Sequence, residues 1–314
     1  MQQEISTPTD LTQGALPPAL PQAWAGLGTE TRGRLEVRRL TSADEPRALE
    51  FLRREPVLNF QMIGLIREHG VESRNNRGTF YGCTEAGRLV AVALLGEWVS
   101  AAGGREALPL FARVARKFHA PKVRVALLSH AGAGVFERVF SGRGGRRVAG
   151  VGAQNLFVKD EEGGGAGPFA RLRLAEPCDM DGVVRAHVQA SLETNGVDPS
   201  AHDPETFRRR LLARVESGRV WVVRDDRGRV IFKTDVAIET DEVAYLEAVW
   251  TSPEFRGRGL GGRAINDLSR RLLGCHRAVC LFAAADKPHL THFYQRLGFR
   301  RVAAYRLLRY ERSR

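Results

Sequence analysis

The sequence is poor in cysteine and has no long apolar run, and each shortage disfavours a class of protein. Its 314 residues contain four scattered cysteines, Cys83, Cys178, Cys275 and Cys280, and no C-x-x-C pair. A disulfide framework or a zinc site is therefore disfavoured, and we expect buried free thiols and no bound metal. No apolar run is long enough to span a bilayer, so we expect no membrane segment. The N-terminal MQQEISTPTD lacks the basic and apolar regions of a signal peptide, and we expect a cytoplasmic protein.

Lysine is scarce, although basic charge is abundant. Lysine and arginine number 48 against 36 acidic residues, the net charge is +12, and only five of the basic residues are lysine. Such an excess favours a polyanionic partner, whether nucleic acid, coenzyme phosphates or an acidic protein. The arginines are spread along the chain, often beside acids as in LRRE and RDDRGR, so a solvated basic surface explains them equally well. Because no recognition motif is present, we expect no specific nucleic-acid partner.

Two stretches without sustained apolar periodicity divide the chain. Residues 1–33 are rich in Thr, Pro, Gln and Gly and predict a flexible leader, with one short helical turn near Ala23. The glycine-rich KDEEGGGAGP predicts a linker over residues 161–168. We therefore expect one domain over residues 34–160 and a second over residues 169–314.

The two expected domains share an order of elements. Each opens with a short strand, a polar turn containing aspartate and a helical pattern, and each continues with two apolar strands about a glycine turn. Each also has a late RRVA sequence, beginning at Arg146 and at Arg300. Matching order at a shift of roughly 135 to 157 residues indicates a tandem repeat.

The second domain predicts the order β-α-α-β-β-β-α-β-α-β. Asp203 followed by Pro204 is typical of a helix start, and Gly218 of a helix stop. The fold class is therefore α/β, or α+β, with a mixed sheet. We expect strands over 220–224, 230–238, 243–251, 278–285 and 301–310, and late helices ending near 273 and spanning 288–297.

The stretch FRGRGLGGRA, which follows the strand expected over 243–251, contains G-x-G-x-x-G at Gly257, Gly259 and Gly262. This pattern is typical of dinucleotide-binding turns. Here five residues, SPEFR, separate the strand from the first glycine, and only one strand–helix–strand follows. A nicotinamide or flavin site is therefore disfavoured. Another interpretation is a solvated Gly/Arg loop before a surface helix, with no phosphate ligand.

A different register, Arg256-x-x-Gly259-x-Gly261, resembles the acyl-CoA signature of the GCN5-related N-acetyltransferases (GNAT). Glycines before a helix let backbone N–H groups turn towards a pyrophosphate, and arginines add charge for it. Tyr294, Gly298 and Phe299 match the late Y-x-x-x-G-F element of the family. The resemblance covers residues 170–310. It implies two tandem GNAT-like domains, each a mostly antiparallel twisted sheet with helices on both faces.

The resemblance implies acetyl-CoA as co-substrate and assigns residues to it. Tyr294 is expected to donate a proton to the departing CoA thiolate. Lys287 falls where the family often has an asparagine, and its ammonium could bind a phosphate instead. The other expected coenzyme-binding residues are the strand residues Val249, Trp250 and Thr251 and the loop residues Arg256, Gly257, Arg258, Gly259, Leu260, Gly261 and Gly262.

An amine acceptor must lose a proton before it attacks, so a base is needed. Glu247 is our candidate, because period-2 alternation puts it on the same strand face as Val249. An ordinary strand carboxylate paired with an arginine is an equal alternative. Glu193, in the SLETNG loop expected after the first helix, is the alternate base or an acceptor-binding residue, and Asn195 in the same loop is a further acceptor candidate.

The N-terminal domain lacks this apparatus, with SAAGGREALPLFARV where the glycine loop belongs and Phe136 or Glu137 where Tyr294 belongs. We therefore expect a degenerate GNAT-like domain there. The predicted function is an acetyl-CoA-dependent N-acetyltransferase acting on an amine of an unidentified small molecule or protein, as a monomer or homodimer. The alternatives are a non-catalytic acyl-CoA-binding regulatory or interaction protein and, less favoured, a nucleic-acid-binding protein.

Overall fold

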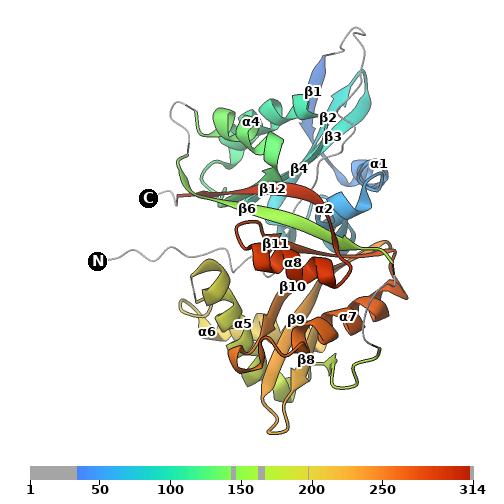
Figure 1. Cartoon of the computed structure of the whole chain (residues 1–314). Helices are drawn as coiled ribbons and strands as arrows, with labels where there is room; N and C mark the ends of the chain where they lie inside the picture. The colour runs from blue at the N-terminus through green and yellow to red at the C-terminus, as the bar shows by residue number, and fades with distance from the viewer. Residues whose placement is uncertain (1–33, 143–145, 162–166, 197, 312–314) are drawn as a thin grey trace. The chain divides into compact units, whose positions relative to one another are not determined.

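The computed structural model of the chain describes residues 34–311, apart from 143–145, 162–166 and 197 (Figure 1). The expected leader, with its turn near Ala23, and most of the expected linker lie outside the described residues. The described chain forms two compact units. The C-terminal unit comprises residues 157–282 and 289–300. The N-terminal unit comprises the residues up to Leu156, the segment 283–288 and the residues from Arg301 onwards.

The N-terminal unit has a sheet with helices on both faces. Its strands lie in the order β1-β2-β3-β4-β5-β12-β6. On one face α1 and α2 pack against β2 and β3, and on the other α3 and α4 pack against β3, β4 and β5. The central β3 is apolar along most of its length because both of its faces are covered. The elements are β1 (Leu35–Arg39), α1 (Glu45–Leu52), α2 (Pro56–His69), β2 (Gly78–Glu85), β3 (Arg88–Gly96), β4 (Trp98–Gly103), α3 (Leu108–Val114), β5 (Val125–Ser129), α4 (His130–Phe140) and β6 (Val148–Lys159).

The last strand of the chain, β12 (Arg300–Tyr310), lies between β5 and β6 in the sheet of the N-terminal unit. It pairs antiparallel with β5, in a register from Tyr305 opposite Ser129 to Arg309 opposite Val125. The Tyr310 ring lies edge-on to Phe140 of α4, with ring centres 4.9 Å apart. The compact units are therefore not consecutive segments of the chain. The boundaries 34–160 and 169–314 stay a prediction for the covalent repeats.

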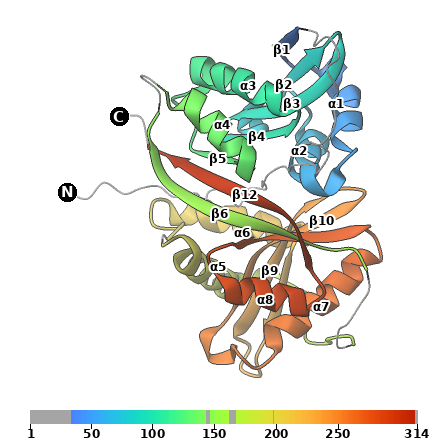
Figure 2. The same ribbon diagram turned by 45° about the horizontal axis from the view of Figure 1, so that its top comes forward.

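The C-terminal unit has the strand order β7-β8-β9-β10-β11. Helices α5 and α6 pack on one face through Val183, Leu211 and Val222, and α7 and α8 cover the other (Figure 2). Only β10 and β11 run parallel. The elements are β7 (Arg173–Leu174), α5 (Met180–Asn195), α6 (Pro204–Glu216), β8 (Val220–Arg224), β9 (Val230–Glu239), β10 (Val243–Thr251), α7 (Leu260–Leu273), β11 (Ala278–Ala284) and α8 (Pro288–Arg296).

The predicted element order of the second domain is confirmed, and so is the mixed, mostly antiparallel sheet. Asp203 caps α6, where its Oδ1 accepts the Thr206 N–H at 2.9 Å. The two halves repeat the same sequence of elements, from β1 to β6 and from β7 to β12. None of the described helices is long and apolar enough to cross a membrane.

Two expectations are wrong. Glu193 and Asn195 lie in the last turn of α5 rather than in a loop, because the helix continues to Asn195 and Gly196 is its C-cap. Gly196 takes the left-handed conformation, with φ of 74°, and its N–H donates to the Leu192 carbonyl at 2.9 Å. Of the four thiols, Cys83 and Cys280 are buried, but Cys178 and Cys275 are exposed, because they lie in turns beside helix ends.

Candidate functional site

The candidate site begins where β10 leaves its parallel neighbour. The pairing of β10 with β11 runs over four positions, from Val243 opposite Ala278 to Leu246 opposite Leu281. Strand β10 continues to Thr251, and along this stretch it pairs only with β9 on its other side. Backbone groups on the β11 side of residues 247–251 are therefore outside the parallel ladder.

A β-bulge lies at this point of divergence. Glu247 pairs with Asp235 and Trp250 pairs with Lys233, so Ala248 and Val249 together oppose one residue of β9. Ala248 has φ of 49°, a left-handed conformation that is uncommon for alanine. Such a bulge interrupts strand alternation and re-aims backbone and side chains. The bulge thus interrupts the simple alternation on which we based a shared face for Glu247 and Val249, and the shared face stays a prediction.

The predicted glycine loop joins the end of β10 to α7. A turn of 3₁₀ helix at Pro253–Phe255 precedes it, and Gly259 is the N-cap of the helix. Gly257 and Gly259 have φ of 73° and 74°, which L residues with side chains rarely adopt. The loop therefore has the backbone shape that places successive N–H groups at a helix N-terminus, where anions are favoured.

Gly261 lies where α7 comes closest to the end of β10. A Cβ atom at Gly261 would lie 2.9 Å from Thr251 Oγ1, so a side chain does not fit without a shift. A Cβ at Gly262 would lie 3.4 Å from Leu297 Cδ2 and 3.8 Å from Phe293 of α8. The first turn of α7 therefore lies between the end of β10 and α8. Because Gly261 and Gly262 have no side chains, they do not cover the backbone of this turn.

The structure brings Arg256 and Glu193 together. One Arg256 nitrogen donates to both Glu193 carboxylate oxygens, at 2.7 and 2.8 Å, and Arg256 Nε donates to the Thr251 carbonyl at 2.9 Å. Both side chains remain nearly half exposed. Arg258 lies over the Phe255 ring, 5.6 Å from its centre. Arg256 thus already binds an anionic group, the Glu193 carboxylate, beside the glycine loop.

Tyr294 is buried among aromatic rings of the C-terminal unit. Its side chain is 6% exposed, and it packs near Phe157, Phe293 and Phe299, with ring centres 5.1 to 5.9 Å away. Burial raises the pKa of Tyr294 far above its usual value. The hydroxyl is therefore protonated at neutral pH and keeps a proton to donate. Its neighbour Phe293 lies 4.0 Å from where a Cβ at Gly261 would be and 3.8 Å from one at Gly262.

Glu247 belongs to a buried ion-pair network. Arg214 of α6 donates to Glu247 Oε1 at 2.6 Å and to Asp235 Oδ2 at 3.0 Å. The Glu247 side chain is only 10% exposed. Burial raises the pKa of Glu247, and the Arg214 charge partly opposes that effect. The arginine pairing that we weighed against the base role is therefore present.

The network continues to residues that the sequence did not single out. Lys233 Nζ lies 2.7 Å from Asp235 Oδ1 and 2.9 Å from His187 Nδ1, and the Lys233 side chain is fully buried. Burial, followed by the nearby Lys233 charge, lowers the pKa of His187 well below its usual value, so His187 is neutral at pH 7. The available signal was FKTD, in which two charged residues stand at alternate positions of a largely apolar strand. Such buried charges must be paired.

The other residues predicted to bind the coenzyme or the acceptor differ in which of their groups a ligand could reach. Trp250 is buried in the core beneath α5 and α6, so only its backbone is available to a ligand. Leu260 begins α7, and Thr251 ends β10. Asn195 ends α5, and its side chain lies outside the described part of the structure. Lys287 follows β11 and is half-buried in a segment that groups with the N-terminal unit.

One cluster of possible metal ligands is taken up by arginines. Glu176, Cys178 and Asp179 bring ligand atoms within 4.8 Å of one another. The Asp179 carboxylate, however, accepts from Arg173 at 2.8 Å and from Arg224. The cluster is thus an ion-pair anchor between β7, β8 and the start of α5.

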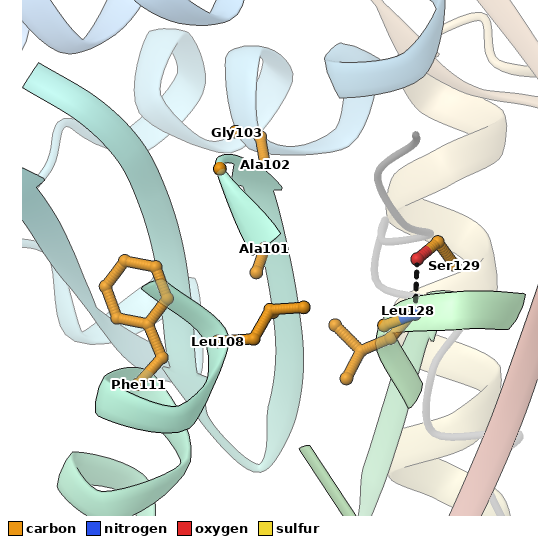
Figure 3. Close-up of a pocket in the computed structure, with 9 residues that line it drawn as sticks. Ala101, Ala102, Gly103, Leu108, Phe111, Leu128 and Ser129 are labelled. Carbon is orange, nitrogen blue, oxygen red and sulfur yellow. Dashed lines mark hydrogen bonds between the residues drawn. The ribbon is translucent and has the colours of Figure 1, made fainter. Parts of the chain in front are cut away.

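The N-terminal unit has the corresponding elements but not the loop. Strands β4 and β5 pair in parallel at two positions and then diverge, as β10 and β11 do. A small pocket lies there, between Leu108, Leu128 and the end of β4, with Ser129 accepting the Gly132 N–H at 2.9 Å (Figure 3). Its enclosed space is about 10 Å³, room for about one water molecule. This pocket is too small for a coenzyme arm.

The comparisons with known proteins agree with this geometry. Residues 216–301 match the family described as "Acetyltransferase (GNAT) domain", so the chain carries a domain of this family. The match contains β8 to β11, the glycine loop and Tyr294. No curated protein matches the chain.

Solved structures of GNAT proteins share the fold over most of the chain. An acetyltransferase from the GNAT family of Colwellia psychrerythraea is 9% identical, with a TM-score of 0.55, over 88% of this chain and 100% of that one. A GCN5-related N-acetyltransferase of Sphaerobacter thermophilus is 15% identical, with a TM-score of 0.55, over 88% and 95%. A tandem GNAT protein from the clavulanic acid biosynthesis pathway is 16% identical, with a TM-score of 0.53, over 90% and 99%. At these identities the likeness shows the fold alone.

Proposed function

Because the chain carries an acetyltransferase (GNAT) domain, we propose that the protein is an acetyl-CoA-dependent N-acetyltransferase that acts on an amine of a small molecule or protein. One observation carries the proposal. The divergence of β10 from β11, the bulge at Ala248 and the glycine-capped start of α7 all lie within one short stretch of chain. We propose that the protein is cytoplasmic, a monomer or homodimer, needs no metal, and has a non-catalytic N-terminal unit.

The loop residues suit the pyrophosphate of the donor. The N–H groups from Gly257 to Gly262 supply hydrogen bonds at a helix N-terminus, and Arg256 and Arg258 supply charge. The close approach at Gly261 keeps side chains away from that backbone. Because Glu193 holds Arg256, the carboxylate must give up part of this contact when a phosphate arrives. The negative charge of Glu193 would then attract the ammonium of an acceptor.

The chemistry needs one group that accepts a proton and one that donates it. The amine nitrogen attacks the thioester carbonyl, the C–N bond forms, and the C–S bond breaks as the thiolate leaves. We propose that Glu247, directly or through water, takes the proton of the amine and that Tyr294 gives its proton to the thiolate. A backbone N–H at Val249, freed from the regular ladder by the bulge, would stabilise the oxyanion.

The second candidate is a non-catalytic acyl-CoA-binding protein. It is favoured by the ion pair between Glu247 and Arg214, because the arginine charge opposes proton uptake by the carboxylate. The two functions differ in whether a thiol is released. Both predict that acetyl-CoA binds.

The deciding experiment measures free thiol released from acetyl-CoA against a broad panel of amines. We expect at least one amine to give turnover, and Glu247→Gln to lower it by about 100-fold without weakening coenzyme binding. Glu254→Gln, a mostly exposed carboxylate beside the loop, is the matched control and should keep full turnover. Binding of acetyl-CoA without turnover for any amine would favour the non-catalytic function.

A further inference from the structure

Basic charge is concentrated in one part of the N-terminal unit. Residues 107–156 contain nine arginines and lysines and a single acid, Glu137, whereas the rest of the chain has 39 basic and 35 acidic residues. The excess in this stretch is therefore eight of the twelve net charges. The described residues of this stretch form α3, the π-helical turn Ala115–His119 that follows it, β5, α4, most of β6 and connecting loops.

The structure brings these segments together on one side of the unit. Arg116, in the π-helical turn, donates to the Val139 carbonyl of α4 at 3.4 Å. Arg146 donates to the Ala120 carbonyl at 3.0 Å, which joins the loop before β6 to the loop after the turn. Helices α3 and α4 pack on each other within one core. We call this region the basic surface; its exposed or half-exposed cations are Arg113, Arg116, Lys117, Lys122, Arg124, Arg138, Arg146 and Arg147.

Several cations of the basic surface lack an acidic partner in the part of the chain that the structure describes. Within the described residues, Arg113, Lys117, Lys122, Arg138 and Arg147 form no ion pair with a carboxylate. Elsewhere in the chain exposed arginines are commonly paired, as Arg208 is with Asp181 at 2.8 Å. Uncompensated like charges in one region raise the local potential and attract polyanions.

An exposed aromatic ring lies among these charges. Phe118 is 59% exposed, more than any other large apolar side chain described. Lys117 Nζ lies 5.1 Å from the centre of its ring. The π-helical turn, a rare geometry that is frequent at functional sites, holds both residues. Folding leaves this ring in water, where it is available for stacking.

We propose that the basic surface binds single-stranded nucleic acid independently of sequence. Arginines and lysines take the phosphates, and Phe118 stacks with an unpaired base. Double-stranded DNA is a poorer fit, because Arg138 is the only arginine or lysine of α4 and the helix so lacks the side chains of a recognition helix. An acidic protein would satisfy the charges but leave the ring without a stacking partner. The proposal is independent of the acetyl-transfer function.

The first test measures binding of a fluorescent single-stranded oligonucleotide of about 20 nucleotides by anisotropy at several salt concentrations. For a single strand, each phosphate contact contributes roughly 0.7 to the steepness with which the logarithm of the binding constant falls against the logarithm of salt concentration. Arg113→Glu/Lys117→Glu/Lys122→Glu should weaken binding at least about 10-fold at low salt and reduce the slope by about 2. The matched control, Arg54→Glu/Arg227→Glu/Arg277→Glu, makes the same change of net charge at exposed sites and should bind nearly as the wild type does.

The second test separates stacking from charge. Phe118→Ala should weaken single-strand binding by about 10-fold and leave the salt slope unchanged, because the ring makes no phosphate contact. A duplex of the same length and poly-glutamate serve as competitors, and both should compete poorly. Equal losses in the two triple variants, equal binding of the duplex, strong competition by poly-glutamate, or no effect of Phe118→Ala would each overturn the proposal. Phe118 and the substituted cations are exposed, and thermal unfolding of each variant checks that the fold is kept.

Discussion

Tyr294 and Glu247 differ in how the fold controls their protons. Burial raises the pKa of both side chains. Tyr294 is surrounded by aromatic rings and keeps its proton at neutral pH, whereas Glu247 faces Arg214, which favours its ionised form. At the scale of residues, the proposed transfer therefore needs one group that can give a proton and one that can take it. The structure provides this asymmetry within one unit.

Tyr294→Phe removes the hydroxyl but keeps the ring. We expect turnover to fall by about 100-fold, because the thiolate loses its proton donor. The affinity for acetyl-CoA should change less than about 2-fold, since packing against Phe157 and Phe299 is preserved. Steady-state kinetics with calorimetry separate the two quantities. Equal losses of turnover and affinity would reject the general-acid role.

His187 makes stability depend on pH. Its pKa is well below the unfolded value near 6.5, so below pH 6.5 the unfolded chain binds a proton that the folded chain does not. Above pH 6.5, His187 therefore does not reduce the free energy of unfolding. Below it, the free energy of unfolding falls with pH, by up to about 1.4 kcal/mol per pH unit. Urea unfolding between pH 7 and 5 measures it. His187→Gln should flatten the profile of unfolding free energy against pH. Burial also lowers the pKa of His119, which is half-buried, so His119 should supply the slope that remains. An unchanged profile would contradict this account.

At the scale of elements, the site depends on how closely α7 approaches the end of β10. Gly261 and Gly262 are adjacent in the first turn of the same helix but have different surroundings. Only a Cβ at Gly261 would lie within 3.0 Å of the strand, at Thr251 Oγ1. The two glycines are therefore a matched pair for testing whether the approach of helix to strand controls coenzyme binding.

Gly261→Ala should weaken acetyl-CoA binding by about 10-fold, because the helix N-terminus or Thr251 must shift. Gly262→Ala should bind within about 2-fold of the wild type. It should also stabilise the fold by up to about 1 kcal/mol, since alanine favours a helix over glycine. Calorimetry and chemical unfolding measure the two effects. The account fails here if both variants bind acetyl-CoA equally well.

Leu308 tests the pairing of β12. It is fully buried in the core of the N-terminal unit, although it lies near the end of the chain. Leu308→Ala should cost about 2–5 kcal/mol and speed amide exchange in β5, which pairs with β12. Leu281→Ala in β11 should instead speed exchange in β10. Faster exchange in β10 for Leu308→Ala, with β5 unchanged, would contradict the assignment of β12.

Local patterns of the sequence were enough to predict the elements of the second half, because caps, turns and apolar periods are local. Asp203 and Gly218 mark the ends of α6 as expected. The bulge at Ala248 was not predictable, because it depends on pairing between β9 and β10. The network from His187 to Glu247 joins four elements, so no spacing in the sequence reveals it. The partner of β12 depends likewise on a long-range pairing.

At the scale of the whole molecule, the two halves repeat one order of elements but keep different chemistry. The C-terminal unit has the glycine loop, the bulge and the buried tyrosine. The N-terminal unit has a pocket with room for about one water and most of the excess positive charge. The net charge of the chain hides this division. Arginines of the C-terminal unit pair with acids, whereas Arg113, Arg138 and Arg147 of the basic surface form no ion pair within the described residues.

Calorimetric titration with acetyl-CoA tests the central claim most directly. We predict one site per chain, because only the C-terminal unit has the loop, and no comparable binding of NAD. Arg256→Glu should weaken binding by about 10- to 100-fold, through loss of a charged hydrogen bond, while Arg277→Glu, an exposed control, should bind normally. Absence of acetyl-CoA binding by the wild-type chain, or an Arg256→Glu variant that binds as the wild type does, would contradict the account.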